Sequence, residues 1–312
     1  MRHRTNALLG GLLLAALVVP LASGCGSSKK SSNTTTAAGA TITSTTSAAS
    51  GVSKDSTVAA MVPAKIKSSG TVTVATDATY APNEFVGNNG KTLMGWDVAL
   101  GEAIGKVMGV DWKFVNASFD TIIPGLQSGK YDVGMSSFSV TPERLKVVDF
   151  VSYFTAGTSF YVKAQGGPTI NSLADLCGHS VGVERGTTQA DDATAQSAKC
   201  KSAGKAAVSV HVYPDQNAAN LAIQSGRQQV GMADSPVAAY IVKQSNGQFK
   251  LTGKSYNNAP YGIALPKGNG MTKPTQAALK VLIKDGTYKQ LLTKWNVQQG
   301  AITNPEINPA VG

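Results

Sequence analysis

Two successive strand-and-helix alternations constrain the fold of this 312-residue chain more than any other feature. In the first alternation, residues 72–76 alternate polar and apolar side chains as a strand does, and apolar residues recur at helical spacing over 98–108. Strand-like residues 110–115 and helix-like residues 119–126 follow them. Because strands that alternate with helices form mainly parallel sheets covered by helices, the pattern predicts an α/β protein.

The second alternation begins after Gly166-Gly167-Pro168, a segment whose composition favours a turn or hinge. Its predicted strands cover 180–183, 208–212, 230–233 and 262–265, and its predicted helices cover 188–199, 218–226, 235–243 and parts of 275–295. A chain of this length can form one large domain or two modest lobes. The repeated pattern favours two lobes, each with a parallel-rich sheet.

The N-terminal segment indicates export. Arg2 and Arg4 precede an apolar run over 7–19, and the small residues at 22–24 suit cleavage by a signal peptidase. The run of about 13 residues is shorter than the roughly 20 that a membrane-spanning helix requires. We therefore predict that residues 1–24 are a signal peptide, with a single-span anchor as the alternative. No later segment is apolar enough to span a bilayer.

The residues around the cleavage point resemble a bacterial lipobox, in which a small residue precedes a cysteine that becomes acylated. Gly24-Cys25 fits this pattern, although Leu21 stands one place further back than usual, with Ala22 in its slot. Residues 25–60 then form a Ser/Thr/Ala-rich linker that cannot bury enough apolar surface to order itself. We predict a lipidated Cys25 and a flexible tether on the outer face of the cell membrane; an ordinary thiol at this position is the alternative.

The formal net charge of +10 does not by itself indicate a nucleic-acid partner. The positive side chains are scattered lysines, without an arginine-rich run or aromatic residues at stacking spacing. A solvated surface facing an anionic cell envelope explains the excess more simply. We therefore predict no nucleic-acid partner.

Motifs for nucleotide binding and hydrolysis are also missing from the sequence. Residues 87–92 end like a phosphate-binding loop, but Phe85 stands where the loop requires its first glycine. The mature chain offers only His179 and His211 as candidate bases, and it has no GxSxG elbow. We therefore predict neither a cofactor nor serine hydrolase chemistry.

Besides Cys25, the chain contains two cysteines, Cys177 and Cys200. In an oxidising compartment they can form a disulfide, which would stabilise the fold by about 3 kcal/mol through the unfolded state. A pair of buried free thiols is the alternative. His179 is the only histidine nearby, so a metal site is not predicted.

The chain resembles the family 3 extracellular solute-binding proteins, which serve polar amino acid importers. The resemblance is clearest over residues 119–150, FDTIIPGLQSGKYDVGMSSFSVTPERLKVVDF. Further motifs follow in the family's order: TVTVATDATYAPNEF at 71–85, GWDVALGEAI at 95–104, VGVERGTTQA at 181–190, GMADSPVAAY at 231–240 and LIKDGTYKQLLTKW at 282–295.

The resemblance implies the two-lobed periplasmic-binding-protein fold, in which two parallel-rich sheets are joined by two hinge strands and the ligand lies between the lobes. The first lobe would comprise residues 61–163 together with 257–312, and the second lobe residues 164–256. A monomer that delivers its ligand to a separate permease and ATPase of an ABC importer is expected.

The resemblance also assigns roles at the ends of an amino acid ligand. Arg144 matches the arginine that clamps the α-carboxylate, a role that suits the paired donors of a guanidinium. Ser139 and Thr188 match positions that complete the carboxylate and ammonium contacts. Ser137 matches a position that offers its carbonyl to the ammonium, and Asp234 matches the carboxylate that pairs with it. Without the family, Arg144 would be a surface residue, Asp234 a helix cap and the serines turn residues.

The positions that match the family's side-chain pocket are Asp77, Tyr80, Phe119, Ser136 and Glu184. The two aromatic residues could enclose an extended or planar group. The two carboxylates favour a cationic side chain by simple Coulomb attraction, which gives a weak preference for a basic amino acid. Many relatives carry another residue at the position of Glu184, so this side chain could instead face solvent.

The predicted function is therefore capture of a polar amino acid for an importer, without catalysis. One alternative is an enzyme, because the same fold hosts dehydratases that act on prephenate or arogenate, and Glu184 or Asp77 could protonate a leaving hydroxyl. The other alternative is a ligand-sensing module that acts through a separate receptor.

Overall fold

The computed structural model describes residues 51–311 of the chain. The predicted signal peptide, Cys25 and the linker up to residue 50 lie outside the described residues. The described part begins near helix α1 (Ser56–Met61), which Asp55 caps by accepting hydrogen bonds from two backbone N–H groups. Val58 of this helix is buried in the core of the first lobe, so α1 packs against the folded chain although all of it but Met61 falls within the range predicted as linker.

The first lobe is built on β1 (Thr71–Thr76), which pairs in parallel with β5 (Asp111–Asn116) and β6 (Val133–Gly134). Its helices are α1, α2 (Ala64–Ser69), α3 (Trp96–Met108), α4 (Phe119–Gln127), α5 (Pro142–Leu145), α9 (Thr272–Lys284), α10 (Thr287–Trp295) and the 3-10 turn η3 (Gln298–Gly300). A small antiparallel sheet is formed by β2 (Thr79–Tyr80), β3 (Glu84–Val86) and β4 (Leu93–Met94).

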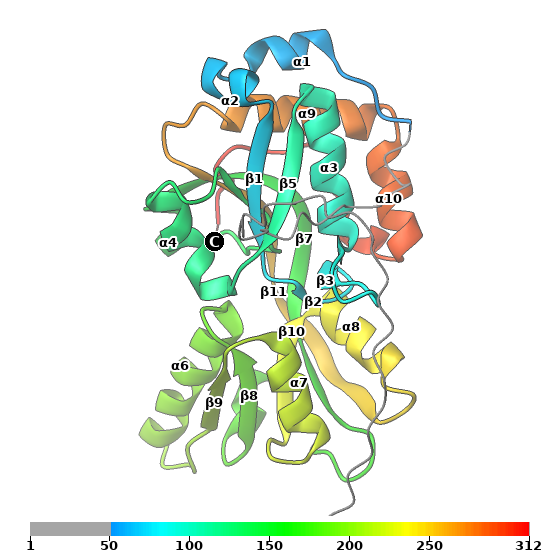
Figure 1. The fold of residues 1–312 in the computed structure, drawn as a ribbon. Helices are drawn as coiled ribbons and strands as arrows, with labels where there is room; N and C mark the ends of the chain where they lie inside the picture. The colour runs from blue at the N-terminus through cyan, green and yellow to red at the C-terminus, as the bar shows by residue number, and fades with distance from the viewer. Residues whose placement is uncertain (1–50, 312) are drawn as a thin grey trace, which may run out of the picture. The chain divides into compact units, whose positions relative to one another are not determined.

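The second lobe repeats the plan on β8 (Ser180–Glu184), which pairs in parallel with β9 (Ser209–Tyr213) and β10 (Val230–Asp234). Its helices are α6 (Thr188–Ser202), α7 (Gln216–Gln224), α8 (Ser235–Gln244) and the 3-10 turn η2 (Leu173–Leu176). The alternating strands and helices predicted from the sequence are therefore present in both lobes (Figure 1).

Two long antiparallel strands, β7 (Val148–Lys163) and β11 (Phe249–Pro266), run through both lobes (Figure 1). Their ends pair regularly, but the register shifts repeatedly between Thr252 and Gly262, where the pair passes from one lobe to the other. The strand order is β5-β1-β6-β11-β7-β10-β8-β9. The two predicted sheets therefore share β7 and β11 and form one hydrogen-bonded sheet of eight strands.

Each lobe has its own apolar core. Helix α3 buries Trp96, Leu100 and Ile104 at a spacing of four residues, and these side chains pack against β1, β7 and α9. A separate cluster in the second lobe includes Phe160 and Met232. Two cores on one shared pair of strands confirm the predicted two-lobed α/β fold.

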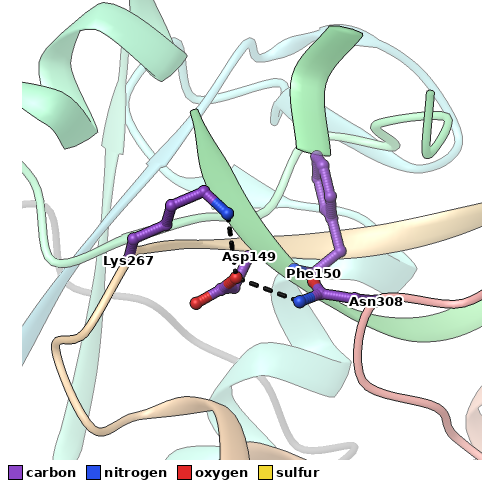
Figure 2. A network of polar contacts seen from close by, with 4 residues as sticks. All are labelled: Asp149, Phe150, Lys267 and Asn308. Carbon is purple, nitrogen blue, oxygen red and sulfur yellow. Dashed lines mark hydrogen bonds and ion pairs between the residues drawn. The ribbon is translucent and has the colours of Figure 1, made fainter. Parts of the chain in front are cut away.

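The C-terminal segment is tied to the first lobe along β7. Asn308 accepts a hydrogen bond from Phe150 N at 2.8 Å and donates from its backbone N–H to Phe150 O at 2.8 Å. Figure 2 shows that Asp149 lies between two donors, Asn308 Nδ2 at 3.0 Å and Lys267 Nζ at 3.4 Å. These contacts hold the end of the chain beside the strand that leads into the second lobe.

Cys177 and Cys200 are joined by a disulfide in the structure, with their Cα atoms 5.7 Å apart. The bond connects the segment after η2 to α6, within the second lobe.

Over residues 51–311, none of the helices combines the length and the apolar character needed to cross a bilayer.

Candidate functional site

A cleft between the two lobes brings together all ten residues that the sequence assigns to ligand binding: Asp77, Tyr80, Phe119, Ser136, Ser137, Ser139, Arg144, Glu184, Thr188 and Asp234. Thr187 and Gln189 also line this cleft, and the sequence did not single them out. A usable signal was the position of Thr187 directly before a predicted helix, because threonine at that position caps the first turn.

The fold explains why these residues meet. Asp77 and Ser136 follow the carboxyl ends of β1 and β6 in the first lobe, and Glu184 and Asp234 end β8 and β10 in the second. In open parallel sheets, ligands bind outside the carboxyl ends of the strands. Because β7 and β11 connect the two lobes, the strand ends of both lobes reach the same cleft.

Arg144 supplies the positive charge of the cleft. It lies on the short helix α5, where its backbone N–H donates to Oγ1 of the capping Thr141 at 3.2 Å. Its guanidinium donates from Nη1 to Ser139 O at 2.8 Å and lies over the ring of Phe119, with Cζ 5.4 Å from the ring centroid. Desolvation lowers the pKa of Arg144 to about 10, so the half-buried guanidinium is charged at neutral pH.

Asp234 is a buried carboxylate on the opposite side of the cleft. Its Oδ1 accepts a hydrogen bond from Gln189 Nε2 at 2.7 Å, and its Oδ2 accepts one from Tyr261 OH at 2.6 Å. Burial raises the pKa of Asp234 to about 6, although these donors and the charge of Arg144 oppose the rise. At neutral pH Asp234 is therefore ionised, and its donors and the charge of Arg144 offset only part of the cost of burying its charge.

Glu184 lies at the end of β8 with only 3% of its surface exposed. Its Oε1 is buried and has no hydrogen-bond partner in the described structure. Desolvation, followed by the negative charges of Asp77, Asp215 and Asp234, raises the pKa of Glu184 well above its usual value. Glu184 thus lines the cleft, where its Oε1 has no donor and the neighbouring charges that act on it are negative.

Asp77 is better satisfied than Glu184. Its Oδ1 accepts hydrogen bonds from Thr79 Oγ1 at 2.7 Å and Thr79 N at 3.1 Å, and its Oδ2 accepts one from Phe119 N at 2.9 Å. Burial still raises the pKa of Asp77, and the charge of Asp215 adds to the rise, although the hydrogen bonds from Thr79 and Phe119 oppose it. Asp77 and Glu184 therefore give the side-chain end of the cleft a negative character.

Two aromatic residues form walls of the cleft. The ring of Phe119 stacks on Phe138 with a centroid distance of 4.7 Å, which leaves it fixed below the guanidinium of Arg144. Tyr80 comes from β2 of the first lobe but packs in an apolar cluster of the second, and its hydroxyl accepts a hydrogen bond from Asp234 N at 2.9 Å. Both aromatic positions predicted from the sequence are thus present in the cleft.

The lobes touch each other around the cleft. Arg144 Nη2 donates to Gly186 O at 3.0 Å, and Arg185 Nη1 lies 3.7 Å from Asp120 Oδ2. A Cβ atom at Gly186 would stand 2.9 Å from Asp120 Cβ, and the φ of 77° at this residue also favours glycine. The described conformation is therefore closed.

Sequence reasoning missed two acidic residues behind Ser136 and Ser137. Glu84 and Asp97 are both fully buried, and both accept hydrogen bonds from serine hydroxyls of the cleft wall. The signal in the sequence was an acid within each of two otherwise uncharged segments, PNEFVG and GWDVAL.

Among residues 51–311, no three His, Cys, Asp or Glu side chains are arranged to hold a metal ion.

Comparison with known proteins places this geometry in a family. The model of the bacterial extracellular solute-binding proteins, family 3, matches residues 72–298. An arginine-binding protein of Corynebacterium glutamicum is 31% identical over 252 residues, which cover 80% of this chain and 82% of that protein.

Solved structures agree with the sequence matches. An ancestral arginine-binding protein bound to arginine is 41% identical with a TM-score of 0.66, and the match covers 72% of this chain and 98% of that one. An ancestral amino acid-binding protein, a precursor of cyclohexadienyl dehydratase, is 36% identical with a TM-score of 0.65, over 74% and 97% of the two chains.

Proposed function

Because this chain belongs to the bacterial extracellular solute-binding proteins of family 3, we propose that its cleft binds a free basic amino acid, with arginine as the foremost candidate, for an ABC importer. The family and the relatives' names support amino-acid binding in transport. The preference for a basic side chain depends on the charges of this cleft.

The α-carboxylate of the ligand would bind Arg144. Two of the guanidinium donors contact Ser139 O and Gly186 O, and the remaining N–H groups are available for a carboxylate. Thr188 begins the 15-residue helix α6 beside this position, and a helix N-terminus attracts anions through its unpaired N–H groups. Ser139 and Thr188 would complete the carboxylate contacts.

The α-ammonium of the ligand would bind Asp234. Gln189 and Tyr261 donate to the two oxygens of this carboxylate, but a carboxylate can accept more than one bond at each oxygen. A ligand ammonium would supply the counter-charge that neutral donors cannot. The carbonyl of Ser137, on the first-lobe side of the cleft, is the proposed second acceptor for the ammonium.

The unpartnered Oε1 of Glu184 is the single observation that carries the ligand class. A buried carboxylate oxygen without a donor is costly, because it has lost its water contacts without gaining others. When they are ionised, the carboxylates of Glu184, Asp77 and Asp234 outnumber the one cation of the cleft lining, Arg144. A ligand with one carboxylate and two cationic groups reduces that excess, whereas glutamate would add to it.

Calorimetric titration of the purified protein with arginine, lysine, glutamine and glutamate tests this proposal. Arginine and lysine should bind and glutamate should not. Glu184→Gln should weaken arginine binding about tenfold more than glutamine binding, since a neutral amide keeps the shape but removes the charge. Glu306→Gln, at an exposed residue, is the matched control. Binding of glutamate or a sugar, with none of the basic amino acids, would overturn the proposal.

The other parts of the transport assignment are also proposed. Export by the signal peptide, acylation of Cys25, a monomeric chain, and delivery to a permease and an ATPase on separate chains are supported by the sequence features above and by the family. Mass spectrometry of the membrane fraction checks the anchor directly. An unmodified Cys25, or equal membrane retention of Cys25→Ser, would contradict it.

A dehydratase activity is the second candidate, and one observation favours it. Glu184 is buried and its pKa is raised, which are properties of a proton donor. The ancestral neighbour that preceded a dehydratase is itself named as an amino acid-binding protein. Turnover of prephenate or arogenate by the purified protein would establish this activity, and its absence beside tight arginine binding would exclude it.

A further inference from the structure

A buried pair of carboxyl groups lies behind the cleft, outside its lining. Glu84 is on β3 and Asp97 is in the first turn of α3, and both are 0% exposed. The hydroxyl of Ser137 lies 3.3 Å from a carboxyl oxygen of each residue, so the two groups are close neighbours. Neither residue was assigned a role by the sequence, and neither lines the cleft described above.

The hydrogen bonds around the pair leave one oxygen without a donor. Asp97 Oδ2 accepts from Tyr153 OH at 2.6 Å and from Ser137 N at 3.0 Å. Glu84 Oε1 accepts from Ser136 Oγ at 3.0 Å. Asp97 Oδ1, however, is buried with no partner. This oxygen remains unsatisfied as long as both carboxyl groups are ionised, whereas a proton on Glu84 would supply the missing donor.

The charges around the pair favour the same arrangement. The titratable groups that face it are Asp77 after β1, Tyr80 on β2 and Tyr153 on β7, and none of them is a cation. Two adjacent carboxylates in a dry site cannot both ionise without a counter-charge. Desolvation and the charge of Asp97 raise the pKa of Glu84 well above its usual value. Desolvation also raises the pKa of Asp97, but only to about 6, because the donors around this group oppose the rise.

Ser137 connects the pair to the cleft. Its φ of 52° lies in the left-handed region, which is unfavourable for a serine unless its surroundings enforce it. Its N–H is held by Asp97 Oδ2, and its Oγ lies 3.3 Å from both Glu84 Oε2 and Asp97 Oδ2. Asn83 Nδ2 donates to the same Oγ at 2.8 Å. The pair and Asn83 therefore fix the backbone of a residue that lines the cleft.

We propose that Glu84 and Asp97 share one proton and act as positioning residues that hold Ser137 in its left-handed conformation for amino-acid binding. The link to binding depends on the proposed function, but the shared proton and the conformation of Ser137 do not. In the pair, neutral Glu84 donates to Asp97 Oδ1, and ionised Asp97 uses Oδ2 to bind the Ser137 amide. A single negative charge then remains in the site.

The test compares Glu84→Gln with Glu84→Ala in the purified protein. Glutamine places an N–H where the carboxyl proton stood, so arginine affinity should stay within about twofold of wild type. Alanine removes the donor and should weaken binding by about tenfold or more. Glu306→Gln again controls for the loss of an acid at an exposed position. Equal losses in the glutamine and alanine variants would overturn the proposal.

Two measurements on the ligand-free protein keep the proposal testable if the alanine variant does not fold. Infrared spectroscopy at neutral pH should show a protonated carboxyl group that is absent from Glu84→Gln and retained in Glu306→Gln. Backbone chemical shifts should place Ser137 in the left-handed region in both wild type and Glu84→Gln. Absence of the carboxyl signal, or an ordinary extended Ser137 in wild type, would refute the inference.

These outcomes separate the inference from the proposed function. If wild type binds no basic amino acid, the ligand assignment fails, whereas the infrared signal and the Ser137 shifts still decide whether the pair exists and acts on the backbone. If wild type binds arginine but lacks the carboxyl signal, the ligand assignment stands and the positioning role is wrong.

Discussion

The buried carboxyl groups of the two lobes differ in their hydrogen-bond partners. In the first lobe, Asp77 accepts three hydrogen bonds, and Glu84 and Asp97 are surrounded by serine and tyrosine hydroxyls. In the second lobe, Glu184 has an oxygen without any donor, and Asp234 has only neutral donors within hydrogen-bonding distance. The first lobe also has a carboxylate oxygen without a donor, Asp97 Oδ1, but Asp97 lies behind the cleft, whereas Glu184 and Asp234 of the second lobe line the cleft, where a ligand can satisfy them.

This difference suggests a division of labour during closure. The first lobe contributes a fixed surface: a guanidinium held over Phe119 and a serine loop held by buried acids. The second lobe contributes carboxylates whose burial is favourable only when a cation enters with them. A hinge between such lobes would close most readily on a cationic ligand, because closure without one buries uncompensated charge.

Replacing Arg144 by alanine should give the largest effect, because it removes the single cation of the first lobe's binding surface. We expect a loss of about 2–5 kcal/mol in arginine binding, which is the usual result of removing one partner of a buried charge contact. Isothermal titration calorimetry measures this loss. Arg227→Ala, at an exposed arginine, is the control. Unchanged affinity in Arg144→Ala would show that the first lobe does not clamp the carboxylate.

Acidification should act on the second lobe. The pKa of Asp234 is raised to about 6 in the unliganded protein, so the charged form that binds an ammonium dominates only above that pH. A bound cation lowers this pKa, and affinity should therefore fall by about tenfold per pH unit below pH 6. The Asp234→Asn variant should bind arginine more weakly at neutral pH, and its affinity should no longer show the pH dependence that the titration of Asp234 causes. A flat affinity between pH 7 and pH 5 would contradict the assignment.

The titration of Asp234 should also affect the stability of the unliganded protein, but acidification should raise this stability while it lowers ligand affinity. Because the folded pKa of Asp234 lies above its usual value of 3.8, its contribution to the stability of the unliganded protein is fully present below 3.8 and is lost as the pH rises through about 6. The difference in unfolding free energy between wild type and Asp234→Asn, followed over this range, isolates the contribution from that of other acids.

Arg185→Ala should give the smallest effect, because it tests only a contact between the lobes. The Arg185 and Asp120 side chains are 55% and 27% exposed, and partly solvated ion pairs contribute about 0.2–1 kcal/mol. Arginine affinity should fall at most about fivefold, and moderate salt should remove the difference through screening. A loss comparable with that of Arg144→Ala would mean that closure depends on this pair and that the lobes are less distinct than their buried charges indicate.

Much of the fold could be predicted because it depends on local patterns. The alternation over 72–76 and the apolar spacing over 98–108 specify β1 and α3 through the geometry of a strand and a helix alone. The sharing of β7 and β11 by both lobes could not be predicted in the same way, since strand partners are set by contacts between residues far apart in the sequence.

For the candidate site, too, some features follow from the sequence and others depend on contacts between distant residues. The sequence by itself determined which residues lie at the ends of strands, and the family motifs assigned the two ends of the ligand to Arg144 and Asp234. Only the tertiary structure decided that Glu184 faces the cleft without a donor, and that Glu84 and Asp97 lie together behind Ser137. Burial and pairing depend on distances across the whole fold. The position of a carboxyl group in the sequence therefore does not determine whether the group is ionised or whether its oxygens have hydrogen-bond donors.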